Sequence, residues 1–206
     1  MKTYPIMLNL HGRLAVVVGG GKVGVRKAKS LRDAGAEVRL VTERAGKGSD
    51  LSGVTVVAEP YRAEHLAGAA LVFACTDDAK LNSAIAADAR RIGALVNVAD
   101  TPAECDFYVP AVTGDGDVVV AVGTGGASPA LARQLKRHLH KHLPANVGKF
   151  AALLAGLRQR VKNEVHDAEK RREVMKRLAE EATFKLFVSE GADAVASMFE
   201  ELIASL

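Results

Sequence analysis

The chain has 206 residues, of which 49% are hydrophobic and 25% charged, so it can bury the core of an ordinary globular protein with one domain or two small ones. Its apolar runs are too short to cross a bilayer and its first residues lack the apolar core of a secretory signal, so we expect a cytoplasmic protein with no membrane span. It also lacks tryptophan, so we expect no aromatic platform for single-stranded nucleic acid. The net charge of +4 is modest, and the two cysteines, Cys75 and Cys105, are too few for a disulfide framework and lack the C-x-x-C spacing of a metal site.

A strand, a glycine-rich turn and a helix are predicted at the start of the chain. The apolar run Leu14–Val18 leads into glycines that follow the G-x-G-x-x-G pattern at Gly19, Gly21 and Gly24. In this pattern the first glycine permits a tight turn, the second lets the backbone approach a pyrophosphate and the third lets the helix pack on the strand. The free N–H groups at the helix start then face the anion. The alternative is a turn that only connects a strand to a helix.

The helix after the glycines is predicted to have one apolar face. Val23, Ala28 and Leu31 are expected to face the sheet, and the basic residues, Lys27 among them, are expected to lie elsewhere. A turn at residues 33–35 ends the helix.

A second strand, Glu37–Val41, follows and leads into Thr42, Glu43 and Arg44. In dinucleotide-binding folds an acidic residue about 20 residues after the glycines binds the ribose 2′-hydroxyl, so Glu43 favours NAD over NADP, whose 2′-phosphate it repels. Arg44 favours NADP instead. The order of these elements predicts a dinucleotide site with a moderate preference for NAD.

Strands and helices continue to alternate up to Asp100. The apolar run at residues 69–75 is typical of a parallel strand that is buried on both faces. The other predicted elements are a polar turn at residues 46–53, strands at 54–58 and 95–98, a short helix at 63–67 and a longer helix at 79–92. This alternation predicts an α/β fold with a doubly wound, Rossmann-type parallel sheet whose ligands bind at the carboxyl ends of the strands.

The alternation stops after Asp100. The apolar runs at residues 107–109 and Val118–Val122 flank a turn at residues 114–116 and predict an antiparallel hairpin. A hairpin outside the main sheet is a candidate for pairing with a second subunit, so we expect a homodimer.

The rest of the chain is predicted to be helical. Ser128 and Pro129 are expected to begin a helix that ends near residue 139, and residues 147–183 and 193–206 are helical by pattern. The expected domains are a Rossmann domain at residues 1–112, a dimerisation and substrate-cleft segment at 113–145 and a helical domain at 146–206.

Positive charge gathers in this second half. Residues 128–183 contain 13 Lys and Arg against 6 Asp and Glu, a surplus that suits an anionic ligand or a nucleic acid and equally a solvated helical face. His138 and His142 are four residues apart on a predicted helix, the spacing of a metal-ligand pair. No carboxylate completes a site nearby, so we expect no metal there.

Several stretches in the first two thirds of the chain resemble one protein family. They are Pro5-Ile-Met-Leu-Asn-Leu10, Val17-Val-Gly-Gly-Gly21 with Arg26-Lys27-Ala28, Cys75-Thr-Asp-Asp78 with Leu81-Asn82, Val96-Asn-Val-Ala-Asp100, Cys105-Asp-Phe-Tyr-Val-Pro110 and Gly123-Thr-Gly-Gly-Ala-Ser-Pro-Ala-Leu-Ala-Arg133. Together they resemble the precorrin-2 dehydrogenases, including the amino-terminal half of the multifunctional siroheme synthases. The helical tail is similar mainly in character, and the chain resembles the dehydrogenase module without the methyltransferase half.

The resemblance implies oxidation of precorrin-2, a tetrapyrrole, to sirohydrochlorin with NAD and, in some members, insertion of ferrous iron. The implied cofactor-binding residues are Gly19, Gly20, Gly21, Lys22, Val23, Gly24, Thr42, Glu43, Arg44 and Thr76. The expected substrate-binding residues are Thr124, Gly125, Gly126, Ser128 and Arg133. Two positions depart from the family: Gly24 stands where alanine is more frequent, and Thr124 stands where some members have a serine beside the substrate cleft, which puts regulation through that position in doubt.

The resemblance also makes Asp100 the acid/base residue. Oxidation removes a hydride and a proton, and NAD accepts only the hydride, so a base must accept the proton. A carboxylate just past the end of a strand can reach both ligands, although a turn aspartate before Thr101 and Pro102 is the alternative. Asp106 is the second candidate, and residues 77–78 are expected to cap a helix.

Two other functions remain open. One is an NAD-sensing module whose basic helices bind a partner or a nucleic acid, whereas the dehydrogenase hypothesis expects neither a nucleic acid nor a membrane as partner. The other is a ferrochelatase that acts on the same tetrapyrrole without NAD.

Overall fold

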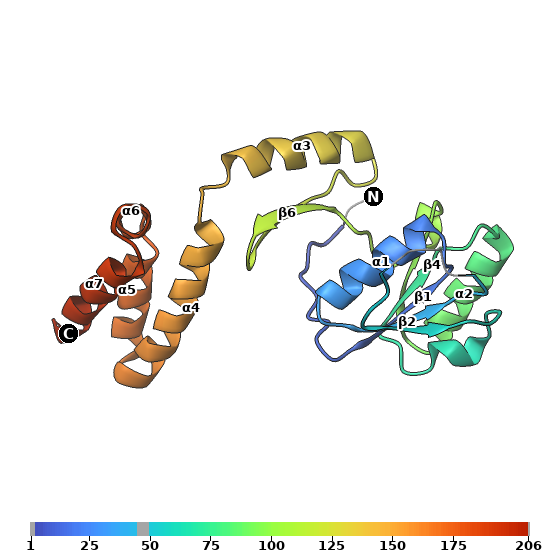
Figure 1. The fold of residues 1–206 in the computed structure, drawn as a ribbon, viewed down its shortest axis with the longest axis horizontal. Coiled ribbons are helices and arrows are strands. Elements are labelled where there is room, and N and C mark those ends of the chain that lie inside the picture. Colours follow the sequence, from blue (N-terminus) through green and yellow to red (C-terminus); the bar gives the residue numbers. More distant parts are fainter. Residues whose placement is uncertain (1–2, 45–49, 206) are drawn as a thin grey trace. The chain divides into compact units, whose positions relative to one another are not determined.

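The computed structural model describes residues 3–44 and 50–205, and the chain divides into two compact units, Met1–Val109 and Pro110–Leu206 (Figure 1). Part of the turn predicted at residues 46–53 and the predicted helix end at residue 206 lie outside the described residues. The three-part division predicted from the sequence stays a prediction.

A five-stranded parallel sheet with the order β3-β2-β1-β4-β5 forms the centre of the first unit. Its strands are β1 (Leu14–Val18), β2 (Glu37–Val41), β3 (Val54–Val57), β4 (Leu71–Ala74) and β5 (Leu95–Val98). Val18 at the end of β1 pairs with Val41 of β2 and Ala74 of β4, so the strands finish at a common carboxyl edge. The predicted doubly wound, Rossmann-type sheet is confirmed.

Helices cover both faces of this sheet, as the side chains of β1 demonstrate. Ala15 and Val17 pack under α1 (Lys22–Asp33), whereas Val16 and Val18 pack under α2 (Ala79–Arg91). All four side chains are almost fully buried, because successive side chains of a strand point to opposite faces. The short 3-10 helix η1 (Ala63–Leu66) lies between β3 and β4, and a second one, η2 (Pro102–Glu104), follows β5.

Two residues of α1 lie on faces that differ from the prediction. Val23 is 42% exposed, because the buried stripe of the helix begins one residue later and consists of Gly24, Val25, Ala28 and Leu31. Lys27 is partly buried, and its Nζ lies 5.3 Å from the centroid of the Phe73 ring. A lysine at the border of an apolar stripe can lay its aliphatic stem along the core, which the simple division into apolar and basic residues ignores.

A hairpin and one helix open the second unit. Strands β6 (Ala111–Asp115) and β7 (Val118–Val122) pair antiparallel, and α3 (Pro129–His142) packs against them. The prediction that residues 107–109 form the first strand is wrong. Gly114 belongs to β6, where a Cβ would collide with the Val118 carbonyl. Since β6 runs to Asp115, the turn is shorter than predicted and begins at Gly116 (φ +53°).

Four helices follow, and the breaks between them contradict the continuous helix predicted for residues 147–183. They are α4 (Val147–Glu164), α5 (Ala168–Leu178), α6 (Glu181–Glu190) and α7 (Ala192–Ala204). Asp167 is the N-cap of α5: its side chain accepts hydrogen bonds from the N–H groups of Glu169 and Lys170 at the start of that helix. Buried Val161, Leu178 and Phe199 form the centre of this bundle.

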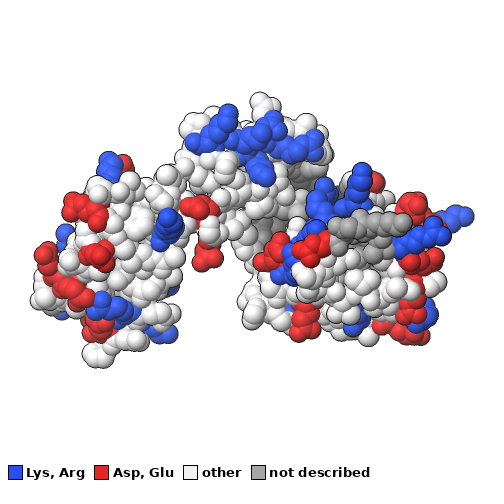
Figure 2. Space-filling model, viewed as in Figure 1, with Lys and Arg blue, Asp and Glu red and all other residues white. Residues whose placement is uncertain are grey.

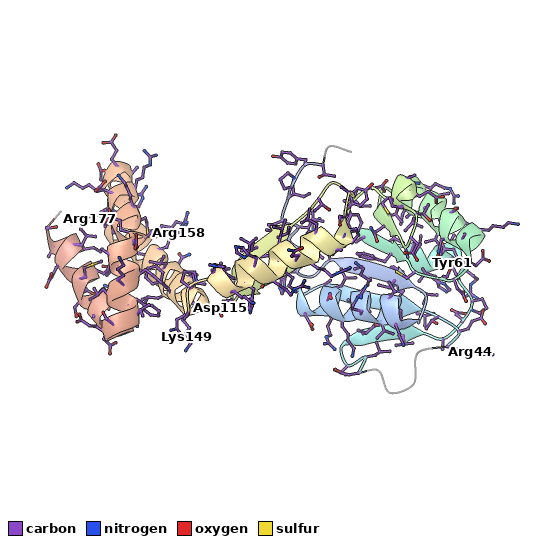
Figure 3. All side chains as sticks on the ribbon, turned by 90° about the horizontal axis from the view of Figure 1, so that it is seen from above. Arg44, Tyr61, Asp115, Lys149, Arg158 and Arg177 are labelled. Carbon is purple, nitrogen blue, oxygen red and sulfur yellow. The ribbon has the colours of Figure 1, made fainter. Side chains whose placement is uncertain are left out.

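The hairpin and α4 are joined by a partly buried hydrogen bond to a carboxylate. Asp115, labelled in Figure 3, accepts a hydrogen bond of 2.8 Å from the N–H of Gly148 at the start of α4. Gly148 has no room for a Cβ, which would meet the Asp115 backbone. In the part of the chain that the structure describes, no helix combines the length and apolar character needed to cross a membrane.

Candidate nucleotide and substrate site

The glycine bend between β1 and α1 is defined by close backbone approaches. Gly19 (φ +111°) lies against the carbonyl group of Cys75 after β4, and Gly20 lies against Thr42 and Arg44 after β2. A Cβ at Gly24 would meet the Gly19 carbonyl and the side chain of Val17, so this glycine makes the close helix–strand contact that the pattern predicts.

Gly21 differs from these glycines, because a Cβ there would meet nothing within 4 Å. It is the residue before the first turn of α1, and no side chain caps that turn. The first turn also contains no acidic residue. Open space, free N–H groups and the positive end of a helix dipole fit a diphosphate, so the residues present at this bend fit a dinucleotide.

The loop after β2 presents the predicted ribose contacts at the same edge. The Thr42 hydroxyl accepts a hydrogen bond from the Arg44 N–H (3.2 Å) and donates one to the Arg44 carbonyl (2.9 Å), which fixes the loop. The side chains of Glu43 and Arg44 are exposed and form no ion pair with another described residue. Arg44 is labelled in Figure 3. Both are therefore available to a ligand.

The loop after β4 is held by a residue that the sequence reasoning missed. Asn82 of α2 is only 5% exposed; its amide accepts a hydrogen bond from the Thr76 N–H (3.1 Å) and donates one to the Thr76 carbonyl (3.0 Å). A signal exists in the sequence, because an asparagine among the apolar residues of a helix face is expected to need buried partners. Asp78 caps α2 as predicted, through the Lys80 N–H at 2.8 Å.

A cavity of about 220 Å³ lies at the carboxyl end of β5. Its lining comes from α1, the end of β5 and the segment that follows: Lys27, Asn97, Val98, Ala99, Asp100, Thr101, Pro102, Cys105, Tyr108 and Val109. Asp100 stands in a turn with left-handed backbone geometry (φ +59°), which aspartate tolerates better than most residues. Its carboxylate forms no hydrogen bond or ion pair within the described residues.

Asp106, the second candidate base, is committed to the fold. Its Oδ1 lies 3.1 Å from Nη2 of Arg90, and its Oδ2 accepts a hydrogen bond of 3.0 Å from the Val96 N–H. These contacts tie the segment after η2 to β5 and α2. Because Asp106 is held by Arg90 and Val96, Asp100 is the better candidate for the proton acceptor. Its catalytic role stays a prediction.

The Cys105 thiol and the Lys27 ammonium group line the cavity, and the Cys75 thiol lies near Lys27. Burial raises the pKa of the Cys75 thiol to about 11, an effect that the nearby Lys27 opposes. Burial lowers the pKa of Lys27, against the influence of Cys75. Cys105 stabilises the turn after β5, because its Sγ lies 3.2 Å from the Val98 nitrogen and 3.3 Å from the Val98 carbonyl oxygen.

The residues predicted to bind the tetrapyrrole lie in the second unit. The Thr124 hydroxyl accepts a hydrogen bond from the Ser128 N–H and donates one to the Ser128 carbonyl, and Ser128 caps α3 through the Leu131 N–H. Gly125 and Gly126 both have positive φ, at +60° and +86°. These contacts shape the turn that begins α3, and the substrate-binding role stays a prediction.

Basic side chains gather along α3 beyond that turn (Figure 2). Arg133, Arg137 and Lys141 are exposed there. His138 and His142 lie with their ring centroids 4.3 Å apart, and Nδ1 of His142 is 2.8 Å from the His138 carbonyl oxygen. Among the described residues, no cluster of three or more His, Cys, Asp and Glu side chains is arranged to hold a metal ion.

Comparisons with known proteins agree with this geometry. A family model described as "Putative NAD(P)-binding" matches residues 6–111, just over half of the chain. The chain is 40% identical over 184 residues to the siroheme synthase of Methylococcus capsulatus and 37% identical over 209 residues to that of Nitrosospira multiformis. The matches cover 87% and 98% of this chain and 39% and 44% of those relatives, so the chain spans about two fifths of the length of the curated relatives it matches.

A solved structure has the same fold. The structure of SirC, a precorrin-2 dehydrogenase, matches with a TM-score of 0.77 at 21% sequence identity and covers 97% of this chain and all of that chain. At this identity the match establishes the fold alone.

Proposed function

The chain belongs to the NAD(P)-binding family whose model matches residues 6–111, and from this premise we propose that it is an NAD-dependent dehydrogenase that oxidises precorrin-2 to sirohydrochlorin. The similarity to siroheme synthases and the fold shared with SirC support this substrate. The observation that carries the proposal is the Asp100 carboxylate, which has no hydrogen-bond or ion-pair partner among the described residues and lines a cavity at the same sheet edge as the glycine bend.

The residues of the bend and the loop after β2 would hold the cofactor. Backbone N–H groups at the start of α1 would bind the diphosphate beside Gly21, and Glu43 would accept a hydrogen bond from the ribose. When bound, NAD supplies the hydride acceptor. Glu43 repels a 2′-phosphate, so we expect NAD to be preferred to NADP.

Asp100 would accept the proton that leaves the substrate together with the hydride. A carboxylate without a partner is free to take up a proton, and general-base catalysis of this kind contributes about 10²- to 10⁴-fold to a rate. The left-handed turn after β5 holds Asp100 at the cavity, and Cys105 fixes that turn through Val98.

The direct test is incubation of the purified protein with precorrin-2 and NAD without oxygen. We expect NADH and the sirohydrochlorin spectrum to appear together, and more slowly with NADP. No spectral change with authentic substrate would contradict the proposal. The same assay with sirohydrochlorin and ferrous iron, in the absence of NAD, tests the iron insertion that the resemblance also implies.

We also propose that the second unit pairs with a second copy of the chain. Thr113 lies on the side of the hairpin that faces α3, since its hydroxyl is 2.8 Å from His140 Nδ1, so Val112 and Val119 lie on the opposite side. They are 44% and 48% exposed. A second apolar stripe runs along α3 and consists of Leu131, Leu135 and Leu139, each at least 39% exposed.

Sedimentation would test this pairing. We expect a dimer for the natural sequence and a monomer for Leu135→Glu, while Gln134→Glu, an exposed neighbour on the same helix, should remain dimeric. A monomeric natural protein at micromolar concentration would contradict the pairing.

A cytoplasmic location is proposed as well. Cys75 and Cys105 are both free thiols, which suits a reducing compartment. Fractionation of the source cells would check it.

A further inference from the structure

The cavity after β5 is lined by an ammonium group that has no anionic partner in the described part of the chain. Lys27 is partly buried and lines the cavity together with Asp100. Within the described residues its Nζ forms no hydrogen bond and no ion pair, and it lies over the face of the Phe73 ring, 5.3 Å from the ring centroid. An ammonium group that leaves water without a partner costs free energy, and a ring face returns only part of it.

The other groups around Lys27 do not supply the missing charge. The pKa of Cys75 is about 11, so this thiol is neutral at physiological pH, and Arg26, the next residue, is a second cation. The carboxylate of Asp100 lies in the same cavity but forms no ion pair with Lys27. The counter-ion that fits the site is therefore an anionic group of a ligand.

We propose that Lys27 binds a carboxylate of the tetrapyrrole substrate and so orients the ring edge toward Asp100. This inference rests on the proposed dehydrogenase function and names a substrate contact outside the residues predicted from the sequence. The cofactor diphosphate is the less suitable anion, since its place is at the first turn of α1. Lys27 lies five residues further along that helix and lines the cavity beyond β5.

The size of the cavity limits what enters it. A volume of about 220 Å³ is smaller than the 300–1,000 Å³ that a drug-sized ligand requires. The cavity therefore accepts one edge of a tetrapyrrole with an acidic side chain, and the remainder of the ring lies outside it. One ammonium and one free carboxylate in such a space provide an anchor for the substrate and an acceptor for its proton.

Three variants test this contact. Lys27→Met removes the charge and keeps an unbranched apolar chain, Lys27→Arg keeps a cation, and Arg26→Met removes a neighbouring charge that does not line the cavity. Binding of sirohydrochlorin is followed by its absorbance, binding of NAD by calorimetry, and kcat and KM with precorrin-2 are measured for each protein. Thermal melting establishes that each variant is folded, and Lys27→Gln replaces Lys27→Met if the latter does not fold.

We expect Lys27→Met to weaken sirohydrochlorin binding and to lower kcat/KM by about 10-fold or more, because it removes a charge-assisted hydrogen bond to the substrate. NAD binding should stay within about twofold, Lys27→Arg should retain part of the affinity, and Arg26→Met should behave like the natural protein. Unchanged tetrapyrrole binding in a folded, neutral Lys27 variant of an active enzyme would overturn this inference alone. A natural protein that neither binds nor oxidises the tetrapyrrole would overturn the proposed function and this contact with it.

Discussion

The ends of β1 and β5 reach the same edge of the sheet but are built in opposite ways. After β1, glycines bring three loops so close together that Gly19 and Gly20 have no room for a side chain. After β5, side chains surround open space, and two of them, Lys27 and Asp100, form no ion pair with any residue that the structure describes. The end of β1 is shaped by backbone contacts and suits a ligand that backbone N–H groups recognise. The end of β5 is shaped by side chains and suits the binding of an anionic group and the transfer of a proton.

This difference separates the expected effects of substitution. Residues of the glycine bend contribute to both folding and nucleotide binding, because the fold itself makes the binding surface. Unpaired side chains at the β5 end contribute little to folding, so their replacement should change activity and leave stability intact. The following predictions test that separation.

The largest effect is expected for Asp100→Asn. Asparagine tolerates the left-handed backbone at this position, so the melting temperature should not change, whereas loss of the proton acceptor should lower kcat by about 10²- to 10⁴-fold. Turnover of precorrin-2 and NAD binding are the measurements.

Asp106→Asn is the matched control for that variant. It weakens the ion pair with Arg90 and the hydrogen bond from the Val96 N–H, so it should lower the melting temperature and keep most of the turnover. The reverse outcome, an inactive Asp106 variant of full stability beside an active Asp100 variant, would assign the base to Asp106 and end the contrast between the two residues.

A smaller effect should appear in the pH dependence of stability, through Cys75 between the two strand ends. Its pKa is about 11 in the folded protein against 9.0 for a free thiol, so the folded state holds this proton more tightly. The contribution to stability is present below pH 9 and is lost as the pH rises through about 11. It amounts to at most about 2–3 kcal/mol, at 1.36 kcal/mol for each unit of pKa.

Denaturant unfolding at pH about 8 and about 11 would measure this contribution. The stability of the natural protein relative to Cys75→Ala should decrease at the higher pH. An equal difference at both pH values would show that the thiol titrates as it does in the unfolded chain.

The strand ends also differ in how far the sequence predicts them. The glycine bend was predictable, because the G-x-G-x-x-G pattern has few structural meanings and each glycine has a separate steric reason. The parallel sheet was predictable as well, from apolar runs that alternate with helices. The prediction was wrong for the first strand of the hairpin, where Gly114 belongs to the strand and not to the turn. It was also wrong for the continuous helix after α3, although Asp167 carries a local N-cap signal that the prediction did not use.

The β5 end was predictable only in part. Asp100 was predicted from its position after a strand and from the family resemblance. That it has no hydrogen-bond or ion-pair partner among the described residues, whereas Asp106 pairs with Arg90, depends on tertiary structure. Lys27 was assigned to the wrong face, because periodicity gives the direction of Cα–Cβ and does not describe how a long side chain folds back over Phe73. The role of Asn82 in holding the loop after β4 was missed, because periodicity marks the apolar face of a helix and does not name the partners that a buried amide will find there.

Adjacent glycines provide a sharper test of the backbone-built end. Gly20→Ala should lower the free energy of unfolding by about 1–3 kcal/mol, because its Cβ meets the Arg44 carbonyl and the Thr42 side chain. Gly21→Ala meets nothing within 4 Å and has a permitted backbone conformation (φ −71°, ψ 177°), so stability should be kept while NAD binding weakens by about 10-fold. Equal stability of both variants would contradict the close approaches described for the bend.

The smallest effect is expected for Glu43, whose side chain lies in the loop after β2, beside the glycine bend. Glu43 is exposed and unpaired among the described residues, so Glu43→Gln should leave the melting temperature unchanged. The neutral amide accepts a weaker hydrogen bond from the ribose and no longer repels a 2′-phosphate, so the preference for NAD over NADP should fall by about 5- to 10-fold, or about 1 kcal/mol. The ratio of kcat/KM with the two cofactors measures it. Arg44→Gln should shift the ratio in the opposite direction, because it removes the cation that favours the phosphate; if neither variant changes the ratio, the ribose is recognised by groups other than this pair.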